Sequence, residues 1–333
     1  MDDPFHIQWH ITNLCNLRCR HCYQDNFSKE NDLDWPGLER VSDNILATLR
    51  EWNKKVCIHL TGGEPLLKPE LFSLLTYLDR NPLVEELGLI TNGILFDPGL
   101  VERLSSYSKL KKIKISLDGA DAETNDSIRQ EKTFEKVIRN LSLVKGKDRF
   151  EVILMLTVMR RNLRGLPSFF NLSKDLGVNG FIIERFIPWG RGRERMEEVL
   201  NRKDWEELIK TISDLFTIEG KDSLLTYQAF QVNFNGNQPE LLGAPCVVGM
   251  DGLCVMPEGT VFPCRRFPVS IGNLLRDSLR AIWEGSEILE RLRRKENLKG
   301  KCGKCEIKDC RGCRSLALAL TGDDLEEDPH CWH

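Results

Sequence analysis

Three cysteines lie within eight residues near the start of the chain, at Cys15, Cys19 and Cys22. Three thiolates at this spacing can hold three irons of an iron–sulfur cubane and leave the fourth iron without a protein ligand. Such an open iron can bind and activate a small molecule. Zinc is the alternative, but zinc sites usually pair their Cys or His ligands and recruit a fourth ligand nearby. The triplet therefore favours an open iron–sulfur cluster over zinc.

Composition narrows the class of protein. The chain has 333 residues and a formal net charge of −3, so its bulk electrostatics indicate no nucleic-acid binding. It shows no signal peptide, and no apolar run approaches the roughly 20 residues of a membrane span. We therefore expect a soluble, cytoplasmic protein that binds no membrane. Twelve cysteines without a secretory signal argue against disulfides and for metal or cluster ligation.

Short β-branched runs alternate with helical patterns from residue 5 to about 216. An amphipathic helix is predicted to begin near Asp34, with Pro36 in its first turn, and another carries Phe134, Val137 and Leu141. Six β–α repeats are too few for a closed eight-unit barrel, so we expect an α/β fold with an open, partial (β/α)6 barrel. The near-continuous apolar runs that suit its parallel strands are residues 5–12, 55–60, 86–91, 112–117, 150–158 and 180–187.

Chemically suggestive residues follow the ends of several predicted strands, where the active sites of such barrels gather. Gly62-Gly63-Glu64-Pro65 follows the second strand and Asn92 follows the third. Ser116 and Asp118 follow the fourth strand, and Arg185 closes the sixth. Asn-Gly and Asp-Gly pairs are also ordinary turn dipeptides, so any single case has a simple structural explanation. Their recurrence at three successive strand ends favours a shared site.

The cysteine triplet and the Gly62-Gly63-Glu64-Pro65 run together resemble the radical S-adenosylmethionine (SAM) superfamily. That family carries a Cys-x3-Cys-x2-Cys loop after its first barrel strand and a Gly-Gly-Glu-Pro motif after its second. The resemblance implies the same partial (β/α)6 architecture. It also implies that the three cysteines ligate a four-iron, four-sulfur (4Fe–4S) cluster whose open iron is chelated by SAM. One electron from this cluster would cleave SAM and give a 5′-deoxyadenosyl radical.

By the same resemblance, other positions would surround SAM. His21 would border the adenine, Ser116 and Asp118 would lie by the ribose or the carboxylate, and Arg129 would neutralise the carboxylate. Two of these positions have structural alternatives, because Glu64 could begin a helix and Arg129 could form a surface ion pair. The glycines and Glu64 would meet the methionyl amine. Together with the strand-end positions, the predicted cofactor-binding residues are His21, Gly62, Gly63, Glu64, Pro65, Asn92, Ser116, Asp118, Arg129 and Arg185.

The sequence pattern divides the chain into a predicted barrel over residues 1–218, a bridge over 219–245 and a cysteine-rich part over 246–333. Residues 253–262 predict a β-hairpin that turns at Glu258-Gly259, and residues 279–294 predict a single helix. The cysteine pattern resembles SPASM, a C-terminal module of many radical SAM enzymes that usually holds two auxiliary 4Fe–4S clusters. The run Cys302-x2-Cys305-x4-Cys310-x2-Cys313 is one residue shorter in both later gaps than that module's usual run.

The family's crossed ligand pattern implies two sets of auxiliary ligands. Cys246, Cys264 and Cys313 would serve the nearer cluster, with Cys254 as a possible fourth ligand. Cys302, Cys305, Cys310 and Cys331 would hold the farther cluster. Cys254 fits equally well as a small buried residue of the hairpin, and Cys57 is predicted to lie in the hydrophobic core. A zinc knuckle over residues 302–313 is the alternative, but it leaves Cys246, Cys264 and Cys331 unexplained.

The resemblance implies hydrogen abstraction from a ribosomally made peptide or protein as the first functional hypothesis. The second is oxidative removal of tetrapyrrole propionates, as in alternative haem biosynthesis, or maturation of another cofactor. Arg185, Arg191, Arg193 and Arg195 could then receive propionates. A non-catalytic electron carrier is the hypothesis of another class, and the Gly-Gly-Glu-Pro run counts against it. An enzyme of this family would take electrons from a flavodoxin- or ferredoxin-type donor.

Overall fold

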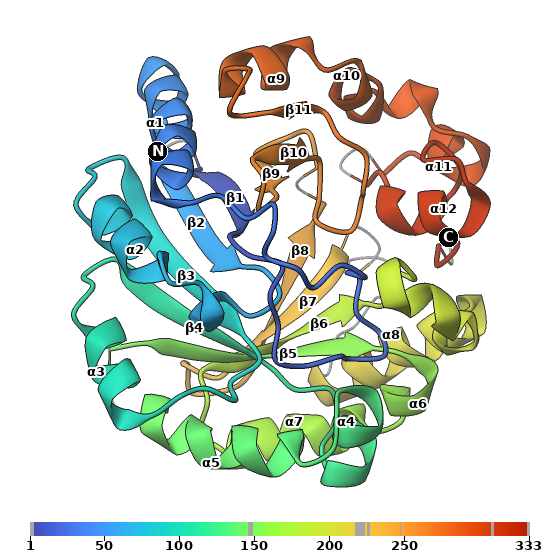
Figure 1. Cartoon of the computed structure of the whole chain (residues 1–333). Coiled ribbons are helices and arrows are strands. Elements are labelled where there is room, and N and C mark those ends of the chain that lie inside the picture. Colours follow the sequence, from blue (N-terminus) through green and yellow to red (C-terminus); the bar gives the residue numbers. More distant parts are fainter. Residues whose placement is uncertain are drawn as a thin grey trace.

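Six parallel strands form the centre of the protein (Figure 1). The computed structural model describes residues 3–145, 149–216, 224, 227–246, 248–307 and 310–331. The strands confirm the expected α/β class and follow one another across the sheet in chain order. They are β1 (Phe5–His10), β2 (Val56–Thr61), β3 (Val84–Thr91), β4 (Leu110–Ser116), β5 (Glu151–Val158) and β6 (Gly180–Arg185).

Helices alternate with these strands and surround the outside of the partial barrel (Figure 1). This arrangement is the expected one for parallel strands, because each crossover must pass over a face of the sheet. The helices are α1 (Trp35–Glu51), α2 (Leu71–Asp79), α3 (Pro98–Ser105), α4 (Ala122–Ile128), α5 (Thr133–Lys145), α6 (Arg160–Leu163), α7 (Leu166–Asp175) and α8 (Arg202–Phe216). Two 3₁₀ segments, η1 (Pro65–Leu67) and η2 (Gly190–Glu198), lie at strand ends.

Helix α1 shows how the sequence sets an element. The Asp34 carboxylate accepts a hydrogen bond from the Gly37 N–H at 3.0 Å, which caps the first turn. Pro36 occupies that turn, where its missing N–H costs nothing. The buried stripe on the strand-facing side of the helix consists of Leu38, Val41, Ile45, Leu46 and Leu49. The predicted helix start near Asp34 is therefore confirmed.

Alternation along the strands separates two environments. On β1, Phe5, Ile7 and Trp9 are buried in the apolar core beneath the helices. The intervening His6 and Gln8 line a cavity inside the barrel, together with side chains from β2, β4 and β6. The outer face of the sheet therefore supplies the hydrophobic stability, while the inner face is free to carry polar side chains.

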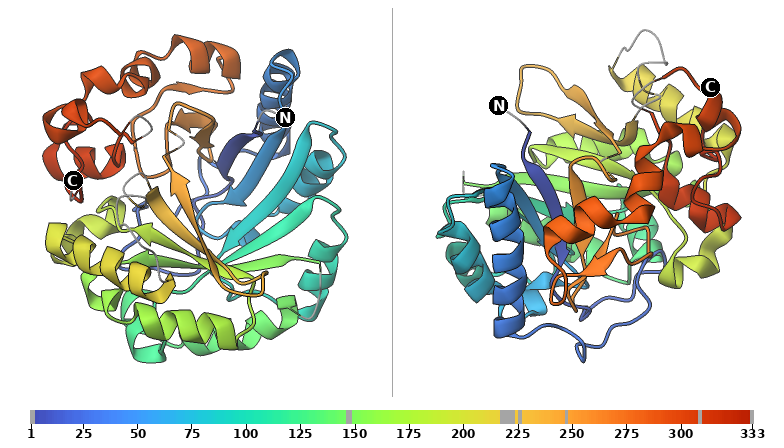
Figure 2. Two further views of the ribbon diagram at one scale, coloured as in Figure 1. Left: turned by 180° about the vertical axis from the view of Figure 1, so that it is seen from behind. Right: turned by 90° about the horizontal axis from the view of Figure 1, so that it is seen from above.

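The C-terminal part joins the same sheet beside β1. Strand β9 (Gly252–Val255) runs parallel to β1, and Val255 pairs with Trp9. Strand β10 (Thr260–Phe262) returns antiparallel to β9, which confirms the predicted hairpin, and β11 (Gly272–Asn273) follows it. The short helices of this part lie between α1 and α8 on the outside of the sheet (Figure 1, Figure 2). The auxiliary cysteines are thus carried on a unit that shares backbone hydrogen bonds with the barrel.

Two strands lie inside the segment that was predicted to be a bridge. Strand β7 (Tyr227–Asn233) pairs antiparallel with β6, and β8 (Glu240–Pro245) pairs antiparallel with β7. The cluster of Asn and Gly between residues 233 and 237 that suggested a linker is the turn of this hairpin. This hairpin extends the sheet of the barrel. The domain limits at 218 and 245 stay predictions.

The single helix predicted over residues 279–294 is wrong. The chain forms two helices there, α9 (Leu279–Gly285) and α10 (Glu287–Arg293), separated at Ser286. Ser286 is extended, and its hydroxyl caps α10 by accepting the Leu289 N–H at 3.3 Å, so a local side-chain bond replaces helical continuity. The segments η4 (Lys295–Asn297), α11 (Gly300–Lys304) and α12 (Arg314–Thr321) follow. In the described ranges, no helix is both long and apolar enough to span a bilayer.

Gly180 offers a test of the junction between β6 and β7. A Cβ at this position would lie 2.0 Å from the Val232 carbonyl oxygen. We predict that Gly180→Ala lowers the unfolding temperature by about 5 °C, because the two strands must separate to admit the methyl group. Differential scanning fluorimetry of the anaerobic protein measures the shift. Gly285→Ala is the matched control, since nothing lies within 4 Å of its added methyl. Equal unfolding temperatures for the two variants would contradict the close packing of Gly180 against β7.

Candidate functional site

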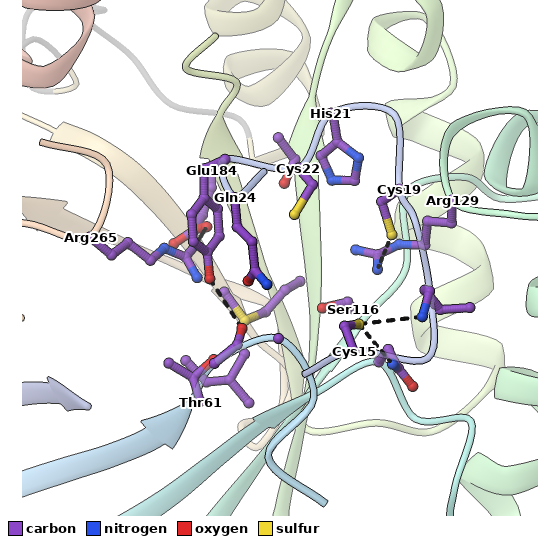
Figure 3. Close-up of a pocket in the computed structure, with 18 of the residues that line it drawn as sticks. Cys15, Cys19, His21, Cys22, Gln24, Thr61, Ser116, Arg129, Glu184 and Arg265 are labelled. Atoms are coloured by element: carbon purple, nitrogen blue, oxygen red, sulfur yellow. Dashed lines mark hydrogen bonds and ion pairs between the residues drawn. The ribbon is translucent and has the colours of Figure 1, made fainter. Parts of the chain in front are cut away.

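One cavity lies at the carboxyl ends of the strands, and all three cysteines of the N-terminal triplet line it (Figure 3). It encloses about 910 Å³ of space between side chains, including the part open to solvent. Glu64, Pro65 and Asp118 are buried and are not among the residues that line it. The structure brings to the wall of this cavity seven of the predicted cofactor-binding residues: His21, Gly62, Gly63, Asn92, Ser116, Arg129 and Arg185.

Backbone hydrogen bonds anchor the cysteine loop at several points. The Ile11 N–H donates to the Thr61 carbonyl at 2.9 Å, and the Arg20 N–H donates to the Ile128 carbonyl at 2.9 Å. The Gly192 N–H donates to the Cys22 carbonyl at 3.0 Å. The loop is therefore held by the end of β2, by α4 and by η2, although no regular secondary structure of its own fixes it.

The three thiols suit an iron–sulfur cluster. Within the described ranges, no three His, Cys, Asp or Glu side chains converge closely enough to share one metal ion, whereas a cubane is wider than an ion. Burial raises the pKa of Cys15 to about 11 and that of Cys22 to about 12, so these thiols become good ligands only when a metal displaces their protons. The Leu17 N–H points at the Cys15 sulfur from 3.4 Å, and an Arg129 nitrogen lies 4.0 Å from the Cys19 sulfur. Such donors stabilise cluster thiolates.

The two glycines after β2 allow the backbone to approach this loop closely. The Gly63 N–H donates to the Thr12 carbonyl at 2.8 Å. A Cβ on Gly62 would lie 2.3 Å from the Thr12 oxygen, and one on Gly63 would lie 2.2 Å from the Leu14 oxygen. Gly62 also has a φ of +152°, which side chains rarely adopt. Only glycine fits at either position, and both glycines line the cavity.

Glu64 supports the site from behind. Its carboxylate is fully buried and accepts the Thr91 hydroxyl at 2.7 Å and the Asn92 N–H at 2.8 Å. It also accepts the Leu66 N–H at 3.2 Å, which caps η1. Burial raises the pKa of Glu64 to about 7, and these donors oppose that rise. Glu64 therefore joins the ends of β2 and β3 and begins a helix; its predicted contact with the methionyl amine stays a prediction.

Asp118 organises a second buried group. Its carboxylate lies 2.7 Å from Arg129 Nε and 3.3 Å from His21 Nε2, and it accepts the Thr157 N–H at 2.8 Å. Burial lowers the pKa of His21 to about 4, so the ring is neutral at ordinary pH and can donate to this carboxylate. Asp118 thereby orients both Arg129 and His21 toward the cavity. The surface ion pair considered for Arg129 is wrong, because Arg129 is buried.

The opposite wall was not predicted. Glu184 and Arg265 line the cavity across from Arg129 (Figure 3), and Tyr23 and Arg266 line it as well. The Tyr23 hydroxyl donates to the Gly62 carbonyl at 3.3 Å. One signal in the sequence could have indicated the arginines, because Arg265-Arg266 directly follows the predicted ligand Cys264.

Arg185 reaches the cavity with its charge already balanced. One of its nitrogens lies 3.0 and 2.8 Å from the two carboxylate oxygens of Asp328, and both residues are buried. The guanidinium also stacks over the Trp205 ring, 4.1 Å from its centroid. Arg191, Arg193 and Arg195 lie on η2 and do not line the cavity. Their proposed contact with propionates gains no support from this placement.

The C-terminal cysteines gather in two groups. Burial is the main reason that the pKa of Cys246 is raised to about 12, and the neighbouring Cys313 and Cys264 add to the rise. The pKa of Cys310 is also raised, chiefly by burial, and the neighbouring Cys302 and Cys305 add to this rise. The Cys302 sulfur accepts the Asp328 N–H at 3.3 Å. Cys254 is buried and points at the Val255 carbonyl, so its ligand role stays a prediction, as does that of Cys331.

Comparison with known proteins decides the family. Residues 9–171 match the model of the radical SAM superfamily, and residues 246–314 match SPASM, described as an iron–sulfur cluster-binding domain. AdoMet-dependent heme synthase of Methanosarcina barkeri is 32% identical over 98% of this chain and 96% of its own length. The chain is a radical SAM enzyme with a SPASM domain. The family implies a SAM-binding 4Fe–4S cluster and auxiliary iron–sulfur clusters, which the cysteine groups above fit.

Other relatives agree with this family. Mycofactocin maturase MftC of Mycobacterium tuberculosis is 28% identical over 99% of this chain and 83% of its own length. The solved structure of His6-tagged anSMEcpe with bound AdoMet superposes with a TM-score of 0.75 at 22% identity, covering 99% of this chain and 94% of that one. AdoMet is SAM. This likeness shows that the barrel and the C-terminal module of this chain have the same overall fold as that solved structure.

Cys19 tests the cluster assignment. We predict that Cys19→Ala abolishes reductive SAM cleavage, because two thiolates cannot hold the cubane in place. Chromatography with mass spectrometry of 5′-deoxyadenosine, together with iron content, measures the loss. Cys57→Ala is the control, since Cys57 is a buried residue of β2 that does not line the site cavity. Retained turnover in Cys19→Ala would refute the ligand role.

A substitution of Asp118 tests whether its carboxylate holds Arg129 in place. We predict that Asp118→Asn weakens SAM binding about tenfold, because Arg129 and His21 lose the carboxylate that orients them. Equilibrium dialysis with the reconstituted protein measures the affinity. Asp126→Asn is the matched control: this carboxylate accepts the Phe134 N–H at 2.8 Å and supports the same segment. An equal loss in both variants would show a structural effect only.

Proposed function

We propose that this enzyme cleaves SAM reductively and abstracts hydrogen from a substrate that lies between the barrel and the SPASM domain. The observation that carries the proposal is that Arg265 and Arg266, within the SPASM match, line the same cavity as the barrel cysteines. A mere electron carrier has no need of such a shared cavity. The SAM-bound cluster supplies the radical, while the residues of the chain bind and orient the reactants and exclude water.

A ribosomally made peptide or protein is one substrate class that we propose. Support comes from the relative that is named a maturase, which aligns with 99% of this chain. The cavity is partly open to solvent, as a polymeric substrate requires. Its wall carries both signs of charge, with Glu184 beside the two arginines, so it can receive polar side chains or backbone groups.

A tetrapyrrole is the second class, and a specific observation favours it. The relative that is named a heme synthase aligns with nearly the whole of both chains at 32% identity. Two partly buried arginines share one carboxylate at the wall of the cavity, which leaves positive charge for an acidic substrate group. Tetrapyrroles of the haem type carry propionate groups that suit such a wall.

The electron supply and the cellular setting belong to the same proposal. The cluster chemistry needs one electron for each SAM cleaved, and we propose a flavodoxin- or ferredoxin-type donor. The twelve cysteines, none of which forms a disulfide in the described ranges, support work in the reducing cytoplasm.

A single assay tests the function and separates the substrate classes. We predict that the reconstituted, dithionite-reduced enzyme converts SAM to 5′-deoxyadenosine. Mass spectrometry then follows deuterium from labelled candidates into that product. Transfer from a peptide supports maturation, and transfer from propionate side chains of an iron porphyrin supports tetrapyrrole chemistry. Protein with full iron content that forms no 5′-deoxyadenosine would overturn the proposed function.

A further inference from the structure

Four arginines line the site cavity, and their charges are not balanced equally. Arg129 has Asp118 as its own partner, and Arg185 has Asp328. Arg265 and Arg266 both turn to Glu184: an Arg265 nitrogen contacts one of its oxygens, and an Arg266 nitrogen lies 3.9 Å from the other. Two guanidinium groups thus share a single carboxylate. Their side chains are only 10% and 19% exposed, so water compensates the remaining charge poorly.

We propose that Arg265 and Arg266 receive a propionate carboxylate of a tetrapyrrole substrate. This inference rests on the second substrate class proposed above. Arginine suits the task because its planar fork can donate two parallel hydrogen bonds to a carboxylate. The charges on the wall make Arg266 the principal donor, since Arg265 is the closer partner of Glu184.

The surroundings hold both guanidinium groups in place. An Arg266 nitrogen donates to the Arg185 carbonyl at 2.8 Å, at the end of β6. The Arg265 guanidinium lies over the Tyr23 ring, 5.2 Å from its centroid, and Tyr23 is bonded to Gly62. The receptor is therefore fixed beside the Gly-Gly run of the SAM site. A carboxylate held there places the carbons of its own side chain inside the cavity with the cysteines.

The rest of the cavity wall suits an apolar macrocycle. Apolar side chains line it between the cysteine loop and the strand ends, where a flat ring can pack. They are Leu17, Phe27, Ile90, Met155, Phe186 and Ile187. The two features together, one cationic edge and one apolar wall, match a ring that carries acidic side chains.

A competing role for the arginines is charge compensation of the auxiliary cluster, because both follow Cys264 directly. The two roles differ in their consequences. A compensating arginine affects cluster content and its electron paramagnetic resonance spectrum. A substrate receptor affects the affinity for carboxylates and leaves the clusters intact.

The experiment titrates anaerobic, reconstituted enzyme with iron coproporphyrin, a porphyrin whose propionates are free, and follows its visible absorption. We expect Arg266→Gln to raise the dissociation constant about tenfold or more, which corresponds to one charge-assisted hydrogen bond. Arg266→Lys should recover part of the affinity. Arg193→Gln is the matched control, because Arg193 is exposed on η2 outside the cavity and should change the constant less than about twofold. The methyl ester of the porphyrin should bind weakly to the wild type and show no dependence on Arg266.

Three results would overturn the proposal. The wild type could fail to bind the porphyrin, which would leave the peptide class as the substrate. Arg266→Gln could bind as tightly as the wild type. The loss of affinity could also follow a proportional loss of auxiliary iron or a changed cluster spectrum, which would establish charge compensation. Formation of 5′-deoxyadenosine without added substrate reports the radical SAM function separately, so its failure is distinguishable from failure of the receptor.

Discussion

The site depends on the close backbone contact between the cysteine loop and the Gly62–Gly63 run. The Gly63 N–H donates to the Thr12 carbonyl and the Glu64 N–H donates to the Leu14 carbonyl, just before Cys15. These bonds require that no side chain stands between the two segments, which only glycine satisfies. The contact fixes the first cysteine relative to the end of β2, and the remaining site residues are arranged around it.

Two arginines at the site cavity follow one rule, in which each guanidinium has a buried carboxylate of its own. Asp118 holds Arg129 on one wall, and Asp328 holds Arg185 on another. Removing either partner from such a pair leaves an unpaired buried charge, which is costly. The shared Glu184 between Arg265 and Arg266 departs from that rule at the place where the barrel meets the SPASM domain. Departures of this kind are expected where a protein keeps binding capacity for a ligand.

The C-terminal tail gives the SPASM domain a defined position against the barrel. The Asp328 carboxylate binds Arg185 of β6 and accepts the Cys313 N–H at 2.8 Å, while its own N–H donates to the Cys302 sulfur. One residue therefore touches the barrel and both groups of auxiliary cysteines. Together with the pairing of β9 on β1, this contact fixes the distance over which electrons would pass between the clusters.

Much of the fold and part of the site were predictable because their signals are local. Strand and helix periodicity indicated the six parallel strands and the start of α1, and cysteine spacing together with Gly-Gly-Glu-Pro indicated the radical SAM chemistry. Prediction failed where a side chain overrode a local pattern, as at Ser286. It was incomplete where a turn such as that of β7 and β8 resembled a linker. Seven of the cofactor-binding positions reach the cavity, but the supporting positions of Glu64 and Asp118 appear only in the folded chain.

The amino-acid sequence by itself determined which residues can bind a cluster and which elements carry them, because ligand spacing and hydrophobic periodicity are properties of short segments. Only the tertiary structure decided that Arg265 forms an ion pair with Glu184, 81 residues away, and that Asp328 neutralises Arg185, 143 residues away. The physical reason is that charge balance and cavity shape arise from side chains that meet across the sheet. Their pairing depends on strand order and register, which no short stretch of the chain specifies.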